Sequence, residues 1–394
     1  MGEQSGITVF TPVYNRTYCI GKAYRSLLEQ TYQNFEWIII DDGSTDNLHE
    51  LVNEWIQEGK IKIIYIRVDN GGKMRAHNVA VMHANKPAFF TLDSDDNLPP
   101  NSLKLVWEWF EHIKLDARYA GVAGLRNCST VQVEEGWEYK DITNCQRREN
   151  GLSMDAAECY KTDILKKYLA PEYENENYLS PTIVTNAMGR DGYLVRWYNK
   201  KIYNFEFQQD GLTRSGDEKF YRNYKGWAHL ICLNCQCKQD ENYREFAYYR
   251  YAKLQQGDLS ICEIAQLLKT DEKTIFAILK KKPFIINRLN SFFMENGIHT
   301  VAIYGLGQEA TRFIRFIDDY SFKIVCGIDR KPNSLLTPCY SLKDNWGEVD
   351  AIIITNKYFI KEIREDLTRI KNVKVYSLQE DILPRPWNYY FCDL

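Results

Sequence analysis

The sequence has little that would direct the chain to a nucleic acid, into a membrane or out of the cell. Its 394 residues carry a formal net charge of −3, so it lacks the basic field that attracts nucleic acid. It has no apolar run long enough to span a bilayer. The opening MGEQSGITVF lacks the basic segment and apolar core of a secretory signal. These absences predict a cytoplasmic protein.

Cysteine is present, but without a framework. The chain has eleven cysteines, an odd number, scattered along its length. In a cytoplasmic protein we expect them to be reduced and unpaired. The tightest group is CLNCQC, from Cys232 to Cys237, and it lacks the second set of ligands that a zinc site needs. Buried thiols are therefore favoured over zinc.

What the chain does have is apolar and aromatic content. The apolar fraction is 44%, enough for ordinary globular cores, and the length predicts two or three domains. Trp, Tyr and Phe together make up 14% of the residues. This share suits stacking against sugar rings, and it equally suits core packing.

The first hundred residues alternate between strand and helix patterns. Strands are expected in 7–15, 35–47, 60–72 and 88–96, and helices in 21–32, 47–59 and 74–85. This order predicts an α/β fold with a doubly wound, largely parallel sheet. Ligands bind such sheets outside the carboxyl ends of the strands. Polar residues follow every one of these strands, at 12–15, 41–42, 70–73 and 93–95, so a site is predicted at this edge.

The stretch FFTLDSDDNLPP ends a strand on three acids in four residues, namely Asp93, Asp95 and Asp96. Their mutual repulsion is costly unless a cation lies among them. Mg²⁺ and Mn²⁺ take oxygen ligands, so either ion is the expected cofactor.

The rest of the chain predicts a continuation of this unit and a second α/β unit. Helices are expected at 103–115, from Thr162 and from Ser180-Pro181, with a strand at 120–126 and a loop at 142–148. The chain is helical and charged from 239 to 282, and strands are expected again after 299, after 323, at 349–355 and at 372–378. We therefore predict a first domain at 1–230, a helical connector at 231–290 and a smaller Rossmann-like domain at 291–394.

The C-terminal domain carries the stretch GLGQEA, Gly305 to Ala310, between a strand and a helix. Asp329 follows at the distance where dinucleotide sites place an acid against a ribose. Rossmann-like domains often keep the fold without the ligand. A structural or partner-docking role is favoured over nucleotide binding.

Four motifs, in order, resemble those of glycosyltransferase family 2. They are TPVYNR, IIIDDGSTD, NGGKMRAHN and LDSDD, and the resemblance covers about residues 5–230. QQDGLTRS, residues 208–215, resembles a later segment of some bacterial members. The resemblance implies the GT-A fold with a mixed sheet, a nucleotide-sugar donor and inversion at the anomeric centre.

The resemblance also implies roles for individual residues. Asp95 is the implied direct metal ligand, and Asp93 faces the ribose or a water on the metal. Asp41 contacts the nucleotide base, and Lys73 or Arg75 approaches the diphosphate. The implied donor-binding set is Thr11, Pro12, Tyr14, Asn15, Arg16, Asp41, Asp42, Gly72, Lys73, Arg75, Asp93 and Ser94. His77 stands where many members of the family have Arg.

The catalytic base is the part of the pattern that this sequence does not supply. An inverting transfer needs a carboxylate to deprotonate the acceptor hydroxyl. The family usually places it at the start of a helix well beyond the D-x-D motif, and Ser180-Pro181 has no carboxylate there. Glu176 is favoured over Glu174, with Asp210 as a further candidate. By the same resemblance, Glu158 and Asp155 flank the acceptor cleft.

We therefore expect a metal-dependent inverting glycosyltransferase. It would move a sugar from a UDP-sugar to a glycan or lipid-linked glycan in bacterial surface polysaccharide synthesis, through peripheral contact with the inner face of the membrane. Two alternatives stay open. A nucleotidyltransferase would open with a Gly-rich, basic loop, which TPVYNR is not. A non-catalytic nucleotide-sugar binding module would account for the missing base. The sequence does not say whether the chain forms a homo-oligomer.

Overall fold

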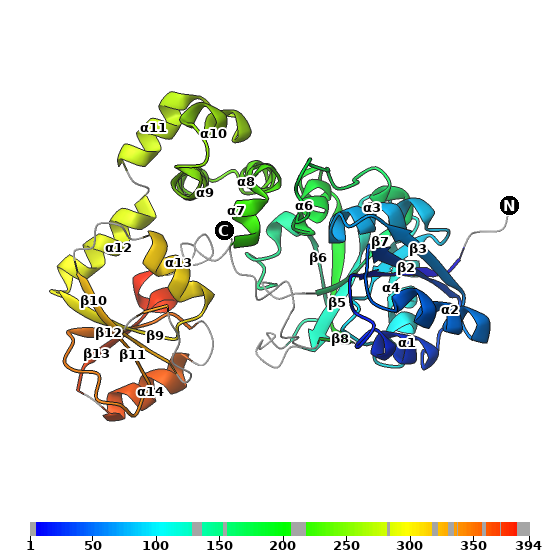
Figure 1. The fold of residues 1–394 in the computed structure, drawn as a ribbon, viewed down its shortest axis with the longest axis horizontal. Coiled ribbons are helices and arrows are strands. Elements are labelled where there is room, and N and C mark those ends of the chain that lie inside the picture. The colour runs from blue at the N-terminus through cyan, green and yellow to red at the C-terminus, as the bar shows by residue number, and fades with distance from the viewer. Residues whose placement is uncertain are drawn as a thin grey trace. The chain divides into compact units, whose positions relative to one another are not determined.

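A computed structural model of the chain describes residues 5–127, 136–152, 156–205, 218–281, 284–316, 322–329, 335–336, 338–356, 360–370 and 372–383. The chain divides into two compact units, Met1–Gln239 and Asp240–Leu394, which Figure 1 colours from blue to red. The predicted boundary at residue 230 falls inside helix α8 (Tyr224–Lys238), which belongs to the first unit. Most of the predicted connector belongs to the second unit, together with the C-terminal sheet.

The first unit is built on an eight-stranded mixed sheet, in the order β3-β2-β1-β4-β7-β5-β8-β6. The parallel half consists of β1 (Ile7–Val13), β2 (Phe35–Asp42), β3 (Ile63–Val68) and β4 (Ala88–Thr91). The mixed half consists of β5 (Tyr119–Asn127), β6 (Tyr139–Thr143), β7 (Ala156–Lys161) and β8 (Leu194–Asn204). Because β7 is antiparallel to both β4 and β5, β5 runs in the same direction as β4.

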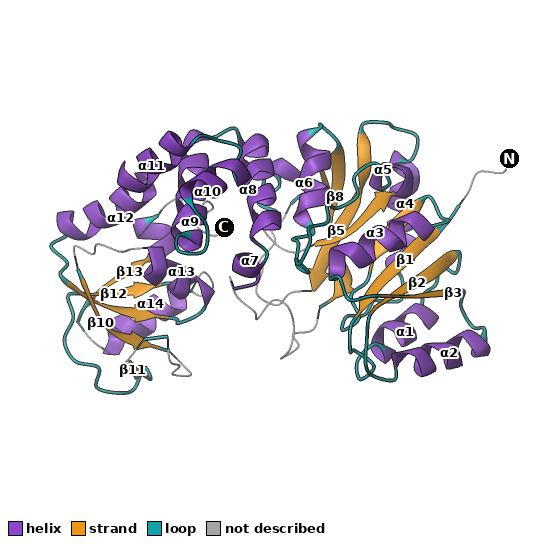
Figure 2. Cartoon of the chain, turned by 45° about the horizontal axis from the view of Figure 1, so that its top comes forward, coloured by secondary structure: helices purple, strands orange, loops and turns teal. Residues whose placement is uncertain are grey.

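Helices cover both faces of this sheet. One face carries α1 (Gly21–Leu28), α2 (Leu48–Glu58) and α4 (Ser102–Ile113). The other carries α3 (Lys73–His83), α5 (Thr162–Leu165), α6 (Thr182–Arg190) and α8, with α7 (Glu218–Arg222) packed on α8. Figure 2 shows α1 and α2 on one side of β1–β3 and α3 on the other. A sheet covered in this way on both faces defines two apolar layers.

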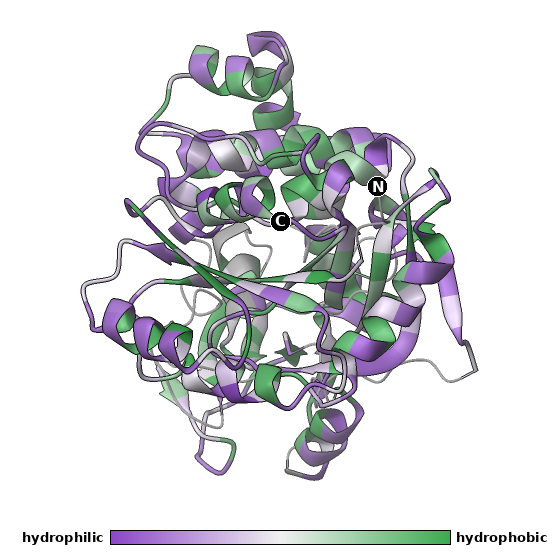
Figure 3. Ribbon diagram, turned by 90° about the vertical axis from the view of Figure 1, so that its right-hand side faces the viewer, coloured by the Kyte–Doolittle hydropathy of each residue, from purple (hydrophilic) through white to green (hydrophobic). Residues whose placement is uncertain are grey.

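Burial on both faces explains the strand sequences. Every residue of β2, FEWIIIDD, is buried, so its apolar residues run without alternation from Trp37 to Ile40. Helices show polar and apolar residues together in Figure 3, as expected for elements with one face on the core and the other in solvent. Much of the aromatic content is core: Trp55 stacks on Tyr24 with ring centroids 4.2 Å apart, and both lie against Trp37.

Two elements of the mixed half differ from the prediction. The predicted loop at 142–148 begins inside β6 and continues into the short 3₁₀ helix η1 (Asn144–Gln146). Residues 194–204, for which the sequence predicts no element, form β8, an interior strand between β5 and β6. The polar run from Asn199 to Lys201 interrupts its apolar pattern, and its pairing with β5 shifts register, so no regular alternation marks this strand.

The second unit combines helices with a smaller sheet. Its helices are α9 (Glu241–Gln255), α10 (Ile261–Leu267), α11 (Glu272–Lys281), α12 (Phe284–Glu295), α13 (Gln308–Phe316), α14 (Ile360–Ile370) and the π-helical turn η3 (Leu378–Ile382). Five parallel strands follow the order β11-β10-β9-β12-β13. They are β9 (Thr300–Tyr304), β10 (Lys323–Ile328), β11 (Cys339–Tyr340), β12 (Ala351–Ile354) and β13 (Lys374–Ser377). No helix in the described part of the chain has the length and apolar character needed to cross a membrane.

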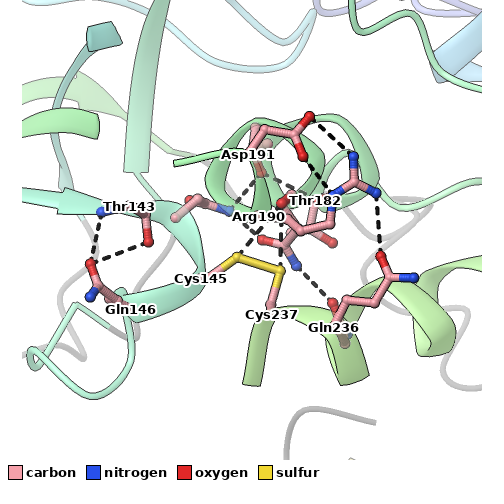
Figure 4. The surroundings of a disulfide bond; sticks show 12 residues. Thr143, Cys145, Gln146, Thr182, Arg190, Asp191, Gln236 and Cys237 are labelled. Carbon is pink, nitrogen blue, oxygen red and sulfur yellow. Dashed lines mark hydrogen bonds and ion pairs between the residues drawn. A yellow bond between two sulfur atoms is a disulfide. The ribbon is translucent and has the colours of Figure 1, made fainter. Parts of the chain in front are cut away.

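The expectation that every cysteine is unpaired is wrong for one pair. Cys145 of η1 and Cys237 near the end of α8 form a disulfide, with Cα atoms 5.4 Å apart (Figure 4). Both sulfurs lie near the carbonyl oxygen of Asn186 in α6. The pair is separated by 92 residues, so no local spacing could have revealed it, and Cys237 is not available to zinc as a thiolate.

Candidate functional site

The carboxyl ends of β1 to β4 meet at one edge of the sheet. In the pairing register, Val13 lies beside Asp41 and Asp41 lies beside Arg67. Phe10 lies beside Thr91, so the residues after Thr91 reach the same level as the end of β1. The structure therefore brings together all four polar strand ends that the sequence singled out, because parallel strands in register end together.

The loop after β1 is tied to the loop after β2. Asn15 has a left-handed backbone with φ of 53°, which asparagine tolerates better than most residues. Its amide donates to Ser44 Oγ at 3.0 Å, and its Oδ1 accepts from the amide of Thr45 at 2.7 Å. Tyr14 is 50% exposed beside this junction. These hydrogen bonds hold the two loops together at the edge of the sheet and leave the ring of Tyr14 exposed beside them.

Three other residues of the predicted donor set lie around this loop. Thr11 is buried, and its Oγ1 accepts a hydrogen bond from the indole of Trp37 at 2.9 Å. Its side chain is therefore part of the core rather than of an open site. Pro12 is half-buried, and the Arg16 guanidinium contacts the hydroxyl of Tyr18.

Asp41 and Asp42 end β2 and are both buried. Asp41 accepts from the amide of Ser44 at 2.7 Å and from the hydroxyl of Tyr65. Asp42 accepts from the amides of Gly71 and Gly72, both at 2.8 Å. Burial raises the pKa of Asp42, and the two amides act against that rise. These carboxylates hold the loops that follow β2 and β3 in place.

Asp93 lies between two cations supplied by the chain. Lys73 Nζ pairs with its Oδ1, and Arg126 Nη2 lies 3.7 Å from its Oδ2. Arg126 also lies 3.7 Å from Asp96 and stacks over the ring of Tyr203 at 4.3 Å. Burial acts to raise the pKa of Asp93, but the charges of Lys73 and Arg126 outweigh it and hold that pKa below its usual range.

Asp95 is the remaining acid of this cluster. Burial and the neighbouring charge of Asp93 raise its pKa, so the carboxylate lies where a further positive charge would be favourable. The described residues contain no group of three or more His, Cys, Asp or Glu side chains placed to hold a metal ion. Two hard carboxylates still suit Mg²⁺ or Mn²⁺, ions that normally keep several ligands from substrate phosphates and water. The carboxylates of Asp95 and Asp93 are thus suitable ligands for the predicted ion. Ser94, which belongs to the predicted donor set and lies between them in the sequence, is buried.

Arg75 is directed to a neighbouring loop. Its Nη2 donates to the carbonyl of Tyr173 at 2.9 Å, and its Nε lies 3.4 Å from Glu172. A Cβ on Gly72 would lie 1.7 Å from the carbonyl oxygen of Asn177, and φ there is +88°. Gly72 is therefore required by the close approach of this loop, residues 171–180. A small pocket lies between the loop and the start of α3.

Glu176, the favoured base, is bound within the protein. It is buried, and its carboxylate accepts from the amides of Lys225 and Gly226 at 2.7 and 2.9 Å. Both oxygens therefore cap the first turn of α8. Because backbone amides occupy both carboxylate oxygens, this geometry argues against Glu176 as the base. Glu174 lies two residues earlier in an exposed turn of the same loop.

The other predicted acids have different surroundings. Glu158 on β7 lies 3.4 Å from Arg147 and accepts from the hydroxyl of Tyr160 at 3.1 Å. Asp155 and Asp210 lie outside the described residues. His77 packs between the rings of Phe10 and Phe89, and burial, aided by the charge of Lys73, lowers its pKa to about 4. His77 is thus a neutral, half-buried residue packed against the core rather than a phosphate ligand.

Sequence reasoning missed Arg126 and Tyr203. The predicted strand at 120–126 ended on Arg126, and β5 runs parallel to β4, so the same rule of strand ends would have found this residue. No sequence motif indicates Tyr203, because it lies near the end of β8, a strand that the sequence does not predict. Its hydroxyl accepts from the amide of Asp93 at 2.9 Å. Only the assembled sheet places it in the site.

Comparison with known proteins shows which families and structures the chain resembles. The family model described as "Glycosyl transferase family 2" matches residues 8–168. Glycosyltransferase GlyA of Streptococcus pneumoniae is 25% identical over 242 residues, which cover 57% of this chain and 33% of GlyA. The teichoic acid poly(glycerol phosphate) polymerase of Staphylococcus epidermidis is 33% identical over 208 residues, 51% of this chain and 28% of that protein. The chain thus spans about a third of the length of these relatives.

Among solved structures, S. aureus TarS 1-349 in complex with UDP-GlcNAc is similar, with a TM-score of 0.50 and 17% identity. The match covers 80% of this chain and 89% of TarS 1-349. The mixed sheet with its charged carboxyl edge is thus a GT-A fold, the fold of one class of nucleotide-sugar-dependent transferases. More narrowly, residues 8–168 match the model of glycosyltransferase family 2, and 57% of the chain is similar to a curated glycosyltransferase.

Proposed function

We propose that the first unit transfers a sugar from a UDP-sugar to a glycan or lipid-linked glycan, with inversion, in the synthesis of a bacterial surface polysaccharide. The observation that carries the proposal is the convergence of Asp41, Asp42, Asp93 and Lys73 at one sheet edge. Two relatives support the donor and polymer class. TarS 1-349 is named in complex with UDP-GlcNAc, and the 33% identical relative is named a teichoic acid polymerase.

In this proposal, different residues of the edge bind different parts of the donor. The Pro12–Tyr14 loop and Asp41 surround the nucleotide base, with Asp42 fixing the loop below it. Lys73 lies near enough to the acid cluster to reach the diphosphate. Asp95 and Asp93 would hold Mg²⁺ or Mn²⁺, and the bound ion would supply positive charge next to the leaving nucleoside diphosphate. Arg126 orients Asp93 and keeps it ionised.

We place the general base on the loop at 171–180. Arg75 ties this loop to α3 through the Tyr173 carbonyl, and α3 begins at Lys73. Glu174 is exposed on the loop, whereas Glu176 is bound to the α8 amides. An exposed carboxylate can approach an acceptor hydroxyl, so Glu174 is the proposed base. Glu158, held by Arg147, is proposed to contact the acceptor.

The direct test is to incubate the chain with UDP-GlcNAc and other UDP-hexoses, with and without Mn²⁺, and to assay UDP. Metal-dependent release of UDP is expected, first as slow hydrolysis and faster with a polyol or glycan acceptor. Thermal unfolding gives a second readout, since a ligand at a hundred times its Kd adds about 2.7 kcal/mol of stability. Pyrophosphate release from UTP would indicate a nucleotidyltransferase. Stabilisation by UDP-sugars with no product from any acceptor would indicate a binding module.

A further inference from the structure

Lys73 occupies one carboxylate oxygen of Asp93, a predicted metal ligand. Its ammonium contacts Oδ1 of Asp93, and Arg126 faces the other oxygen. The two side chains of the Lys73–Asp93 pair are 30% and 21% exposed, so solvent screens this pair only in part. Asp95 makes no ion pair within the described part of the chain. Of the two predicted metal ligands, one is therefore already neutralised by the chain.

The two cations on Asp93 differ in freedom. Arg126 is fixed by its stacking on Tyr203 and by donation from Nε to the carbonyl of Ala156 at 3.1 Å. Lys73 is the first residue of α3, and its long, flexible side chain makes no other described hydrogen bond. Lysine is a compact point charge that can change partners without a fixed geometry. Lys73 is thus the cation that can leave Asp93.

We propose that Lys73 couples metal binding to donor binding. Without a donor, Lys73 holds Asp93 and weakens the affinity of the acid pair for a divalent cation. When a diphosphate arrives, Lys73 transfers to a phosphate oxygen and frees Oδ1 of Asp93. This inference rests on the proposed function, because it takes the diphosphate of a nucleotide as the second partner. Lys73 is a positioning residue in this scheme.

The physical reason is competition between like charges. An ammonium and a dication on one carboxylate oxygen repel each other, so either one lowers the affinity for the other. A diphosphate offers the ammonium several anionic oxygens and thereby removes the competition. By linkage, the nucleotide raises the metal affinity by the same factor by which the metal raises the nucleotide affinity.

The test uses the full chain and two separate titrations. Mn²⁺ binding without nucleotide is followed by the electron paramagnetic resonance signal of free Mn²⁺, for the wild type, Lys73→Gln and Lys73→Arg. UDP binding without metal is measured by calorimetry on the same proteins. Lys62→Gln is the matched control, because Lys62 pairs with buried Glu36 at 2.9 Å at the opposite, amino-terminal edge of the sheet.

Removing the Lys73 charge is expected to tighten Mn²⁺ binding and to weaken UDP binding, each by roughly tenfold, the middle of the range for such couplings. Lys73→Arg and Lys62→Gln should resemble the wild type. Equal Mn²⁺ affinity in the wild type and Lys73→Gln, with UDP still bound by the wild type, would overturn this inference and leave the proposed function standing. Failure of the wild type to bind UDP even with Mn²⁺ would overturn both.

Discussion

The carboxyl edges of the two sheets have the same layout and different chemistry. In each, a first strand leads through a turn to a helix, and a second strand ends on an acid. In the first unit, the second strand ends on Asp41 and Asp42, and Asp93, which follows β4, meets the side-chain cations Lys73 and Arg126. In the second unit, Asp329 accepts from the amide of Leu306 at 2.7 Å, and Thr355 donates to the carbonyl of Tyr304 at 3.1 Å.

The two edges differ in the partners of their polar side chains. At the second edge these side chains bind backbone groups, whereas at the first edge Asp93 pairs with charged side chains. In the second edge these polar groups bind the backbone of its own loops, which stabilises the turn after β9. The first edge also supports its loops, through Asp41 and Asp42, but adds a separate group of acids and cations from β4, α3 and β5. A parallel sheet therefore offers a place for a ligand, and at the first edge the proposed donor site adds charged side chains to that place.

The largest expected effect comes from the acid cluster. Asp95→Asn should lower metal-dependent UDP release from a UDP-sugar by roughly a thousandfold, because it removes a hard ligand that would neutralise the leaving group. Asp329→Asn is the matched change at the other edge and should leave the rate unchanged. A similar loss from both variants would break the comparison.

The disulfide gives the next effect and concerns only the first unit. Cys145→Ser opens a closed loop of 92 residues and should lower the free energy of unfolding of this unit by about 3 kcal/mol. Urea unfolding with and without a reducing agent measures the change, and the second unit should unfold at an unchanged urea concentration. If a reducing agent does not alter the wild-type transition, the bridge contributes no stability.

Glu174 and Glu176 form a matched pair within one loop. Glu174→Gln should lower kcat by roughly a hundredfold without changing stability, because it removes the proposed base. Glu176→Gln should cost about 1–2 kcal/mol of stability, because the α8 amides lose a charged acceptor, and kcat should stay near the wild-type value. Steady-state kinetics and thermal unfolding on both variants decide the assignment. The opposite outcome would restore Glu176 as the base.

Asp329→Ala probes the backbone support at the second edge. The amide of Leu306 loses its acceptor, so the turn after β9 should lose about 1 kcal/mol. Hydrogen exchange of the peptide at 300–307 reports the change, and UDP affinity should not move. Loss of UDP binding in this variant would show that the second edge also holds a nucleotide.

The smallest expected effect is the gain in thermal stability that Asp95→Asn produces, which depends on pH. The raised pKa of Asp95 means that the folded protein binds its proton more tightly than the unfolded chain does. Stability therefore falls as pH rises past the ordinary carboxyl pKa of about 4. Asp95→Asn should raise the Tm of the ligand-free protein by about 1–2 °C at pH 7 and by nothing near pH 3, where both states are protonated. Thermal scans at the two pH values measure this difference.

The parallel half of the first sheet could be predicted because its signals are local. Continuous apolar strands such as IIIDD, with helices between them, fix both the element type and the strand direction. Asp93 and Asp95 could be placed at the edge for the same reason. The mixed half could not, because β8 changes register against β5 and its polar run hides the alternation.

The sequence by itself determined that a doubly wound sheet ends in acids at one edge. It also determined the resemblance of four motifs to those of glycosyltransferase family 2. Only the tertiary structure decided how those acids are used. Lys73 and Arg126 come from different elements than Asp93, Glu176 meets the α8 amides 49 and 50 residues away, and Cys145 meets Cys237 across 92 residues. Local patterns set strands and helices through backbone geometry and burial. The partner of a charge depends on distance in space, which the chain acquires only when the sheet has formed.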